Sequence, residues 1–303
     1  MGLDNMNDHY DVRLKEYRLA RLRELEGFRF VQEDIEKRET VRDVFERLGP
    51  FDAVLNLAAR AGVRASLQDP QRYLATNVLG TLNLLDMCRD FGVRKFILAS
   101  TSSLYAGQKM PFREDLPVNT PISPYAASKK AAEVLAYTYH YLYGIDIAVV
   151  RYFTVYGPAG RPDMSIFRFI KWIVEGHPVV VYGDGSQSRD FTYVEDIARG
   201  TVSALSVHGY EIINLGSDGP HSLNEVIERI EKLTGKKANI EYRDFERTDV
   251  KATWADIGKA EKLLGWQPRV SLDEGLQRAL KWYRDNQYWV EILSRGGMNG
   301  TSL

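Results

Sequence analysis

Apolar runs alternate with amphipathic segments along the first half of the chain. The runs FRFV, DAVLNLA, KFILAS and DIAVVRYF, which start at Phe28, Asp52, Lys95 and Asp146, contain little polar alternation. Such runs are typical of parallel strands that are buried on both faces. Helical spacing of apolar residues fills the intervals at Lys37–Leu48, Pro70–Phe91 and Pro124–Tyr143. Strands that alternate with helices in this way predict an α/β fold with a doubly wound parallel sheet of the Rossmann type.

The pattern changes after Tyr156. Turn-forming residues gather in GPAGRPDM and YGDGSQS, the apolar runs shorten, and helical spacing returns near Asn224–Thr234 and Asp273–Asn286. We therefore expect a sheet domain over residues 1–155. A smaller α/β lobe is expected over residues 156–303, with some of its segments returning to the main sheet.

The start of the chain does not fit a dinucleotide-binding sheet. Such a sheet opens with a strand and a glycine-rich turn that places pyrophosphate at a helix N-terminus. The chain begins instead with GLDN, which has the pattern of the end of a second strand, so that Asp4 stands where an acid binds the adenosine ribose. We expect about 25 residues, the first strand and its turn, to be missing. A chain truncated in this way should fold poorly or bind cofactor weakly, because its sheet loses hydrogen bonds.

Composition narrows the function classes. A formal net charge of −1 shows no basic excess, which disfavours nucleic acid as a partner. Apolar runs as long as about 18 residues are absent and no signal peptide precedes the fold, so we expect a soluble, cytoplasmic protein that does not bind a membrane. Cys88 is the single cysteine, which excludes an internal disulfide, and without a cluster of ligands around it we expect no metal site.

Tyr125 and Lys129 are the first candidates for chemistry. They stand four residues apart in SPYAASK, within a predicted helix, so their side chains share one face. An ammonium group beside a phenol favours the phenolate and lowers the phenol pKa. A Tyr/Lys pair of this kind can accept a proton from a sugar hydroxyl while hydride leaves the adjacent carbon. The same spacing also occurs in solvated surface pairs, so the spacing alone leaves both interpretations open.

Eight segments, in order, resemble the extended short-chain dehydrogenase/reductases of the NAD-dependent epimerase/dehydratase family. Within that family the chain is most similar to the UDP-glucuronate 4-epimerases, from Gly2 to about Tyr283. The segments are GLDNMNDHYDVRLKEYRLARL, LAARAGVR, NVLGT, STSSLY, YAASK, RYFTVYGPAGRPDM, GDGSQSRDFTYVEDIA and LGWQPRVSLDEGL.

The resemblance implies an NAD-dependent isomerase that epimerises a UDP-sugar at C4 through a 4-keto intermediate. UDP-glucuronate converted to UDP-galacturonate is the expected reaction. Sugar-nucleotide 4,6-dehydratases carry Asp-Glu where this chain has Ser102 and Ser103, and UDP-glucuronate decarboxylases usually have glutamate at the position of Ser103. Two alternatives stay open: a 4-epimerase of UDP-glucose or UDP-N-acetylglucosamine, and a truncated remnant that binds a UDP-sugar or dimerises without turnover.

The resemblance also assigns roles to residues. It implies that Thr154 and Arg161 meet the C6 carboxylate of the sugar and that Arg189 holds the diphosphate. The loop RTDV keeps only Asp249 and Val250 of the family's uridine-binding segment. The expected catalytic residues are Thr101, Tyr125 and Lys129. The expected NAD-binding residues are Asp4, Asn5, Asp34, Ile35, Leu57, Ala58, Ala59, Arg60, Asn77, Tyr125, Lys129 and Phe153. The expected UDP-sugar-binding residues are Arg64, Ser102, Thr154, Arg161, Arg189 and Asp249.

A homodimer is the last expectation. The segments Pro70–Phe91 and Pro124–Tyr143 correspond to helices that pair between subunits in this family. Their apolar residues can form the buried face of that interface, although burial inside one chain is the alternative. These residues are Leu82, Leu85, Val134, Leu135 and Leu142.

Overall fold

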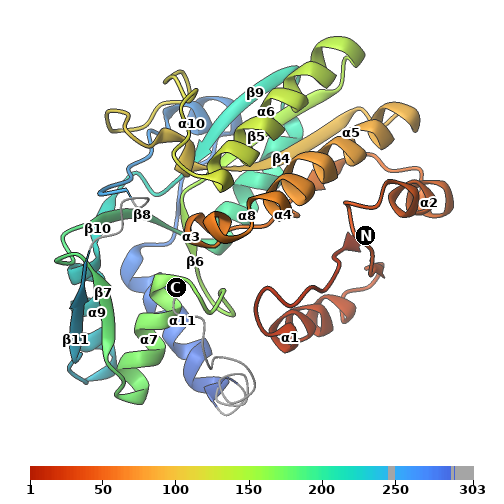
Figure 1. Cartoon of the computed structure of the whole chain (residues 1–303). Coiled ribbons are helices and arrows are strands. Elements are labelled where there is room, and N and C mark those ends of the chain that lie inside the picture. The colour runs from red at the N-terminus through yellow and green to blue at the C-terminus, as the bar shows by residue number, and fades with distance from the viewer. Residues whose placement is uncertain (245–249, 288–289, 291–303) are drawn as a thin grey trace.

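The main sheet has four parallel strands. The structure is a computed structural model that describes residues 1–244, 250–287 and 290. The sheet order is β3-β4-β5-β9, with Lys95 opposite Asp146 and Ile147 opposite Tyr210 (Figure 1). The predicted parallel α/β sheet is therefore confirmed. The strand bounds are β3 Val54–Asn56, β4 Lys95–Thr101, β5 Asp146–Tyr152 and β9 Tyr210–Leu215.

Helices cover both faces of this sheet because neighbouring strand residues point to opposite sides. On β4, Phe96 and Leu98 face one apolar core, whereas Ile97 faces another. The first core lies under α2, α5 and α6, and the second lies under α8 and α10 (Figure 1). This arrangement is the doubly wound one that the sequence predicts. The helix bounds are α2 Arg38–Leu48, α5 Gly80–Asp90, α6 Pro124–Tyr143, α8 Val194–Ser203 and α10 Gly258–Leu264.

The helix α6 has the predicted bounds, and its ends explain why. The Ser123 hydroxyl accepts a hydrogen bond from the Ala126 amide at 3.2 Å, and Pro124 occupies the first helical turn. Gly144 ends the helix in the left-handed region, with φ of 63°, and donates its amide to the His140 carbonyl at 2.8 Å. Both signals are local to the chain, so the sequence alone was sufficient to place them.

The predicted continuous helix over residues 70–91 is interrupted. The structure has α4 at Pro70–Leu74, a π-helical turn at Ala75–Leu79, and then α5. At the junction, a Cβ on Gly80 would lie 2.6 Å from the Ile35 Cδ1 atom, so glycine allows the close approach. Single π-turns inside helices frequently mark functional sites, and this one carries Asn77.

The N-terminal segment forms a sheet of its own. Strand β1 (Gly2–Leu3) pairs in parallel with β2 (Phe30–Val31), and neither joins the four-stranded sheet. The prediction that FRFV is a buried strand was wrong, since Phe28, Phe30 and Val31 are only partly buried and two residues pair. Among the strands that the structure describes, β2 pairs with β1 alone, so no described strand covers its other edge.

The helix α1 (Val12–Arg23) connects this segment to the second half of the chain. The Arg18 guanidinium donates from Nε to the Ala159 carbonyl at 3.0 Å. The Trp282 indole donates to the Tyr17 hydroxyl at 3.0 Å. Figure 1 shows α1 set apart from the main sheet.

Part of the second half forms a smaller lobe with its own core, whereas α8, β9 and α10 belong to the main sheet and its cover. One sheet has the order β10-β8-β6 and another pairs β7 with β11. The helices α7, α9 and α11 pack on them through a cluster that includes Phe169, Ile227 and Leu276. The predicted helices in this region are confirmed to within one residue. The strand bounds are β6 Thr154–Tyr156, β7 Val179–Tyr182, β8 Ser188–Tyr193, β10 Pro220–Ser222 and β11 Ile240–Arg243. The helix bounds are α7 Ser165–Glu175, α9 Leu223–Thr234 and α11 Leu272–Asp285, with short helices at α3 Val63–Gln68, Ser102–Tyr105 and Ala204–Ser206.

Among the described residues, none of the helices has the length and apolar character required to span a bilayer.

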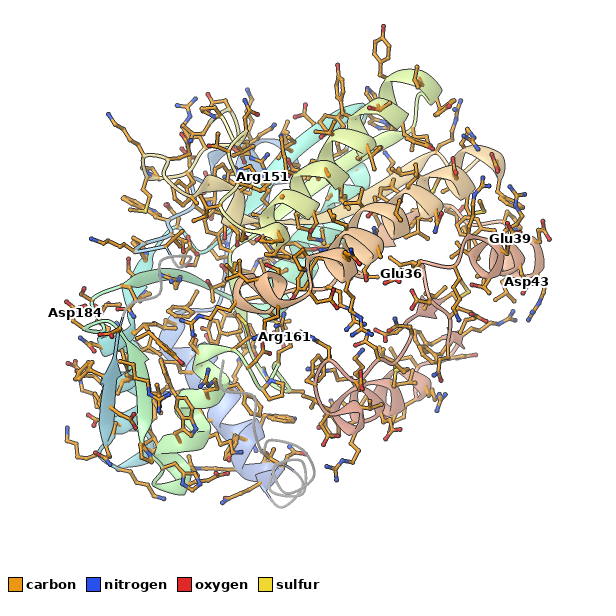
Figure 2. The ribbon with its side chains drawn as sticks, in the orientation of Figure 1. Glu36, Glu39, Asp43, Arg151, Arg161 and Asp184 are labelled. Atoms are coloured by element: carbon orange, nitrogen blue, oxygen red, sulfur yellow. The ribbon has the colours of Figure 1, made fainter. Side chains whose placement is uncertain are left out.

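A buried ion pair ties α6 to the sheet. The Arg151 side chain on β5 donates from Nε and Nη2 to the two Glu133 carboxylate oxygens, at 2.9 and 2.8 Å. Both side chains are 1% exposed. The Ser100 hydroxyl donates to Glu133 at 2.7 Å, and Arg151 donates from Nη1 to the Tyr105 hydroxyl at 2.7 Å. Figure 2 places Arg151 within the main sheet beside α6.

Replacing Arg151 by methionine should destabilise the protein strongly. The change leaves the Glu133 carboxylate buried without its cation, which costs about 3–5 kcal/mol of unfolding free energy. Urea denaturation of both proteins measures the difference. Arg47→Met is the matched control, because the Arg47–Asp43 pair is exposed at 68% and 53%. The control should change the free energy by about 0.5 kcal/mol or less, and an equally small loss in Arg151→Met would contradict the prediction.

Candidate active site

Thr101 and Tyr125 meet at the carboxyl end of the main sheet. Thr101 is the last residue of β4, and Tyr125 lies in the first turn of α6. Burial raises the pKa of the Tyr125 hydroxyl above its ordinary value of 10.0. A hydrogen bond from the Thr101 side chain and the positive charge of Arg161 both act to lower that pKa. The structure therefore joins two of the three predicted catalytic residues directly.

The sequence predicts that the Lys129 ammonium group lies beside the Tyr125 hydroxyl, whereas the structure directs it to the backbone of β4. Its Nζ atom donates to the Ala99 carbonyl at 2.6 Å, and the side chain is 5% exposed. Burial lowers the pKa of Lys129 to about 8, against the opposing charge of Glu133. The cation that lowers the Tyr125 pKa is Arg161, not Lys129. The physical reason is that the β4 carbonyl offers the ammonium group a buried acceptor.

Asn77 organises the loop that follows β3. Its side-chain oxygen accepts the Arg60 amide at 2.8 Å, and its Nδ2 atom donates to the Arg60 carbonyl at 3.0 Å and to Ser128 on α6 at 2.8 Å. Arg60 is itself 7% exposed, whereas Leu57 is 57% exposed. The predicted cofactor loop, from Leu57 through Ala58 and Ala59, is thus attached to the helix that carries Tyr125.

Among the residues predicted to bind adenosine, the structure joins Asn5 and Asp34. Asn5 donates from Nδ2 to the Asp34 carboxylate at 2.8 Å, across the ends of β1 and β2. Ile35 is buried under Gly80. Asp4 is directed elsewhere: its Oδ1 atom accepts from Lys15 at 3.2 Å. Of the four predicted residues, Asn5, Asp34 and Ile35 lie together, and Asp4 is paired with α1.

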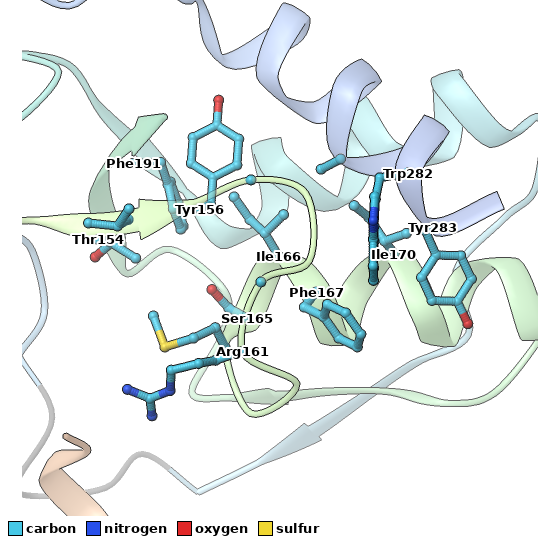
Figure 3. Close-up of a pocket in the computed structure, with 15 residues that line it drawn as sticks. Thr154, Tyr156, Arg161, Ser165, Ile166, Phe167, Ile170, Phe191, Trp282 and Tyr283 are labelled. Atoms are coloured by element: carbon cyan, nitrogen blue, oxygen red, sulfur yellow. The ribbon is translucent and has the colours of Figure 1, made fainter. Parts of the chain in front are cut away.

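Among the residues predicted to bind the sugar, Thr154 and Arg161 line one cavity between β6, α7 and α11. Figure 3 shows the polar atoms of Thr154, Ser165 and Arg161 on one side of the loop, with Phe167 and Trp282 on the other. The cavity therefore has a polar rim and an apolar wall. Figure 2 places Arg161 between the main sheet and the smaller lobe.

The remaining predicted residues lie around this cavity or beyond it. Arg64 on α3 stacks its guanidinium 4.1 Å from the centre of the Tyr182 ring on β7, which joins the two halves. Arg189 lies on β8, where Nη1 donates to the Ser188 carbonyl at 2.8 Å. Phe153 is buried, with its amide bound to the Leu215 carbonyl at 3.3 Å. Ser102 opens the short helix after β4. Asp249 lies outside the described residues.

Two site residues were missed by sequence reasoning. The Tyr73 ring packs edge-on against the Tyr125 ring, with 6.2 Å between the ring centres. The Tyr73 hydroxyl donates to the Ala61 carbonyl at 3.1 Å. Asp163 forms a two-bond ion pair with Arg161. The spacing of GRPDM contained the signal for Asp163, since a carboxylate two residues after an arginine across a proline turn can fold back onto it. Nothing local to Tyr73 indicates its contact with α6.

The comparisons with known proteins agree with this geometry. Residues 2–279 match the family described as GDP-mannose 4,6 dehydratase. A UDP-glucuronate 4-epimerase of Thermodesulfobacterium geofontis is 60% identical over 287 residues, which is 94% of this chain and 88% of that protein. The chain therefore belongs to the NAD-dependent epimerase/dehydratase family of extended short-chain dehydrogenases/reductases.

Solved structures with this fold include enzymes that carry cofactor and substrate. The UDP-glucuronic acid 4-epimerase of Bacillus cereus, in complex with UDP-glucuronic acid and NAD, is 38% identical with a TM-score of 0.87, over 94% of this chain and 90% of that one. The UDP-glucose 4-epimerase of Thermotoga maritima with UDP-glucose is 30% identical with a TM-score of 0.85, over the same shares. The family match begins at residue 2 and Gly2–Leu3 is a strand, and neither finding supports the expected absence of an opening strand and turn.

Because the Lys129 ammonium group is buried, we expect the stability of the protein to depend on pH. An unfolded lysine has a pKa of about 10.4, whereas the folded chain lowers the pKa of Lys129 to about 8. Below pH 8 both states are charged, and the folded state bears the cost of burial. As pH rises from about 8 to 10.4, the folded chain releases the proton before the unfolded chain does. The unfolding free energy of the unchanged protein therefore increases relative to that of Lys129→Met.

Lys129→Met should therefore be more stable than the unchanged protein at pH 7, and the advantage should shrink between pH 8 and 10.4. Because one pKa unit is about 1.4 kcal/mol, the change across this window should be about 2–3 kcal/mol. Urea denaturation at several pH values measures it. Lys281→Met on α11, where the side chain is 76% exposed, is the control. An advantage that stays constant across the window would rule out the buried charge as its cause.

Proposed function

We propose that the chain catalyses the NAD-dependent interconversion of UDP-glucuronate and UDP-galacturonate by epimerisation at C4. The observation that carries the proposal is the Thr101–Tyr125 contact at the carboxyl end of β4. The positive charge of Arg161 acts on the same tyrosine and lowers its pKa. Ligands of open α/β sheets bind at this end of the strands. The similarity to UDP-glucuronate 4-epimerases, at 60% and 38% identity, supports the same reaction.

The residues at the strand ends suit a dinucleotide. The Asp34 carboxylate beside Asn5 offers acceptors for adenosine, and the exposed Leu57 offers an apolar surface. We assign the adenosine end to Asp4, Asn5, Asp34 and Ile35, and the nicotinamide end to Leu57, Ala58, Ala59, Arg60, Asn77, Tyr125, Lys129 and Phe153. When bound, NAD supplies a hydride acceptor that later returns the hydride to the sugar.

Tyr125 is the proton acceptor in this mechanism. The sugar C4 hydroxyl loses its proton to the phenolate, which Thr101 and Arg161 stabilise by lowering the Tyr125 pKa. Thr101 also holds the C4 oxygen, with Ser102 as a second contact. With NAD as the hydride acceptor, loss of both the C4 proton and the C4 hydride would give a 4-keto sugar. Return of the hydride to the other face of the rotated sugar would require Tyr125 to give the proton back. The Thr101 Oγ atom is oriented by the Ser103 amide, which donates to it at 3.1 Å.

Charge at C6 determines the choice of substrate. A carboxylate can accept a hydrogen bond from the Thr154 hydroxyl and a charge-assisted one from Arg161, which is worth roughly 1.5–3 kcal/mol. A neutral C6 hydroxymethyl leaves Arg161 without that partner. Arg189 and Arg64 suit the diphosphate, since planar guanidinium groups bind phosphate oxygens in pairs. We assign most of this UDP-sugar site, including Asp249, to residues 156–303, with Arg64 and Thr154 contributed by the preceding part of the chain.

A second candidate is a protein that binds a UDP-sugar without turnover. The observation that favours it is the separation of β1 and β2 from the main sheet. The strand β3 is left at the sheet edge, where Leu55 and the following Leu57 are 37% and 57% exposed. A dinucleotide at this edge needs a backbone turn for its pyrophosphate. Turnover measurements separate the two candidates.

The protein should convert UDP-glucuronate to UDP-galacturonate in the presence of NAD, and Tyr125→Phe should slow this conversion at least about a hundredfold. The reason is that phenylalanine cannot accept the C4 proton. Chromatography of the two UDP-sugars over time measures the rate. Tyr242→Phe, in which the parent side chain is 55% exposed on β11, is the control and should keep full activity.

UDP-glucose serves as the neutral comparison substrate. The preference for UDP-glucuronate should be about tenfold to a hundredfold, because 1.4 kcal/mol is a factor of ten. Equal kcat/KM values would reject the glucuronate assignment and leave a general hexose 4-epimerase. Binding of UDP-sugars with no conversion of either would favour the second candidate.

We also propose a homodimer through α5 and α6. Val134, Tyr137 and Tyr141 lie at positions i, i+3 and i+7 of α6 and are 53%, 52% and 75% exposed. Leu142 is exposed as well, whereas Leu85 was wrongly predicted for this face, since it is 0% exposed in the core under α5. Leu82 and Leu135 pack only partly against the same core. An apolar helix face of this size calls for a cover, and a second copy of the chain provides one.

Light scattering at micromolar concentration should give twice the mass of one chain. Val134→Glu should reduce it to a single chain, because a carboxylate would be buried at the interface without a partner. Val202→Glu is the control, since Val202 is similarly exposed, at 59%, but lies on α8 over the opposite face of the sheet. A single-chain mass for the unchanged protein would refute the dimer.

A further inference from the structure

Arg161 is already engaged by an acidic residue of its own loop. Its Nε atom donates to the Asp163 Oδ1 atom at 3.1 Å, and Nη2 donates to Oδ2 at 2.5 Å. A turn brings the two together: the Met164 amide donates to the Arg161 carbonyl at 3.2 Å, and Pro162 restricts φ at the second position. Asp163 is thus placed beside the guanidinium by the chain itself.

The pairing uses only one edge of the guanidinium. Arginine carries five N–H donors in a planar fork. Asp163 takes the edge formed by Nε and Nη2, and Nη1 makes no hydrogen bond to any residue that the structure describes. The edge formed by Nη1 and Nη2 therefore retains donors for a second planar acceptor. In Figure 3 the guanidinium points away from the apolar wall, on the side where Thr154 presents its hydroxyl.

The charged groups around the pair leave Asp163 as its anionic member. His9 lies within electrostatic range of both Arg161 and Asp163, and its pKa is lowered by burial first and then by Arg161, so it is neutral at pH 7. Arg60 acts on the same histidine as a further cation. Asp163 in turn has its pKa lowered by Arg161 against the effect of burial, so its carboxylate is charged.

We propose that Asp163 is a positioning residue for substrate charge: it holds one edge of Arg161 so that the other edge faces the C6 carboxylate of UDP-glucuronate. The inference rests on the proposed function for the identity of that carboxylate. A long side chain that is free to change rotamer must be ordered when substrate binds, and a chain already ordered avoids this cost. Asp163 acts through Arg161 and does not touch the substrate.

An opposite effect of Asp163 is physically possible and gives the test its direction. A second carboxylate beside the guanidinium repels the substrate carboxylate, so a competing Asp163 would weaken the binding of UDP-glucuronate. Removal of a positioning residue lowers the preference for the charged sugar, whereas removal of a competitor raises it. The separate edges of the guanidinium favour positioning, because each carboxylate has donors of its own.

The experiment compares dissociation constants for UDP-glucuronate and UDP-glucose by titration calorimetry in the unchanged protein and its variants. Asp163→Asn should lower the preference for UDP-glucuronate about tenfold, a change of about 1.4 kcal/mol, with UDP-glucose binding unchanged. Asp163→Glu, which restores the carboxylate, should recover part of the preference. Where conversion is measured, the loss should fall on KM for UDP-glucuronate and leave kcat within about twofold, because Asp163 does not touch the C4 hydroxyl.

The chain offers a matched control in Asp115. Arg113 donates from Nε and Nη2 to Asp115 at 3.1 and 2.9 Å, with the same two-residue spacing as Arg161 and Asp163. This pair is exposed and lies in the loop beside α10. Asp115→Asn removes an equivalent ion pair and should leave the preference unchanged.

The outcomes separate the inference from the proposed function. Equal binding of both sugars by the unchanged protein, or a preference that survives Arg161→Ala, would reject the proposed recognition of the C6 carboxylate. If Arg161→Ala abolishes the preference but Asp163→Asn leaves it unchanged or raises it, the positioning role is overturned while the proposed function stands. If Asp163→Asn does not fold, Asp163→Glu decides: a preference as low as that of Arg161→Ala in a folded Asp163→Glu protein would also overturn the role.

Discussion

The ion pair between Glu133 and Arg151 is the constraint on which the candidate active site depends. Glu133 lies on α6 one turn after Lys129 and two turns after Tyr125, and Arg151 lies on the central strand β5. A fully buried, two-bond pair allows little sliding of the helix over the sheet, since any shift would leave a charge without its partner. This ion pair therefore fixes the position of α6 along β4 and β5, and with it the contact of Tyr125 with Thr101.

The same network shapes the electrostatics of the catalytic helix. Glu133 raises the pKa of Lys129 against the larger lowering effect of burial, so the ammonium group sits in a low-dielectric site with a carbonyl and a distant carboxylate as its partners. Tyr125 depends on a cation from another part of the chain, Arg161. One residue would thus serve two purposes in the proposed mechanism: Arg161 meets the substrate carboxylate and favours the phenolate.

The proposed sugar end and the proposed adenosine end of the site are supported to different degrees. At the sugar end, contacts across the halves of the chain hold the walls together, through Arg64 on Tyr182 and Arg18 on the Ala159 carbonyl. At the adenosine end, Asp34 and Asn5 rest on a two-stranded sheet that does not join the main one. Contacts between distant parts of the chain therefore support the proposed sugar end, whereas the proposed adenosine end rests on a short separate sheet. This difference agrees with the exposed leucines along β3.

Local signals in the sequence were sufficient for β3, β4 and β5 of the main sheet and for the bounds of α6. Family resemblance, not local spacing, named Thr101 and Tyr125 as members of one candidate site. Apolar runs, a serine cap and a terminal glycine act within a few residues, so they can be interpreted without the fold. Only the tertiary structure decided the direction of the Lys129 ammonium, the interruption at Asn77, the burial of Leu85 and the half-exposed state of β2. Each of these depends on which distant groups supply an acceptor, a close neighbour or a second strand, and such contacts leave no mark in the spacing of residues along the chain.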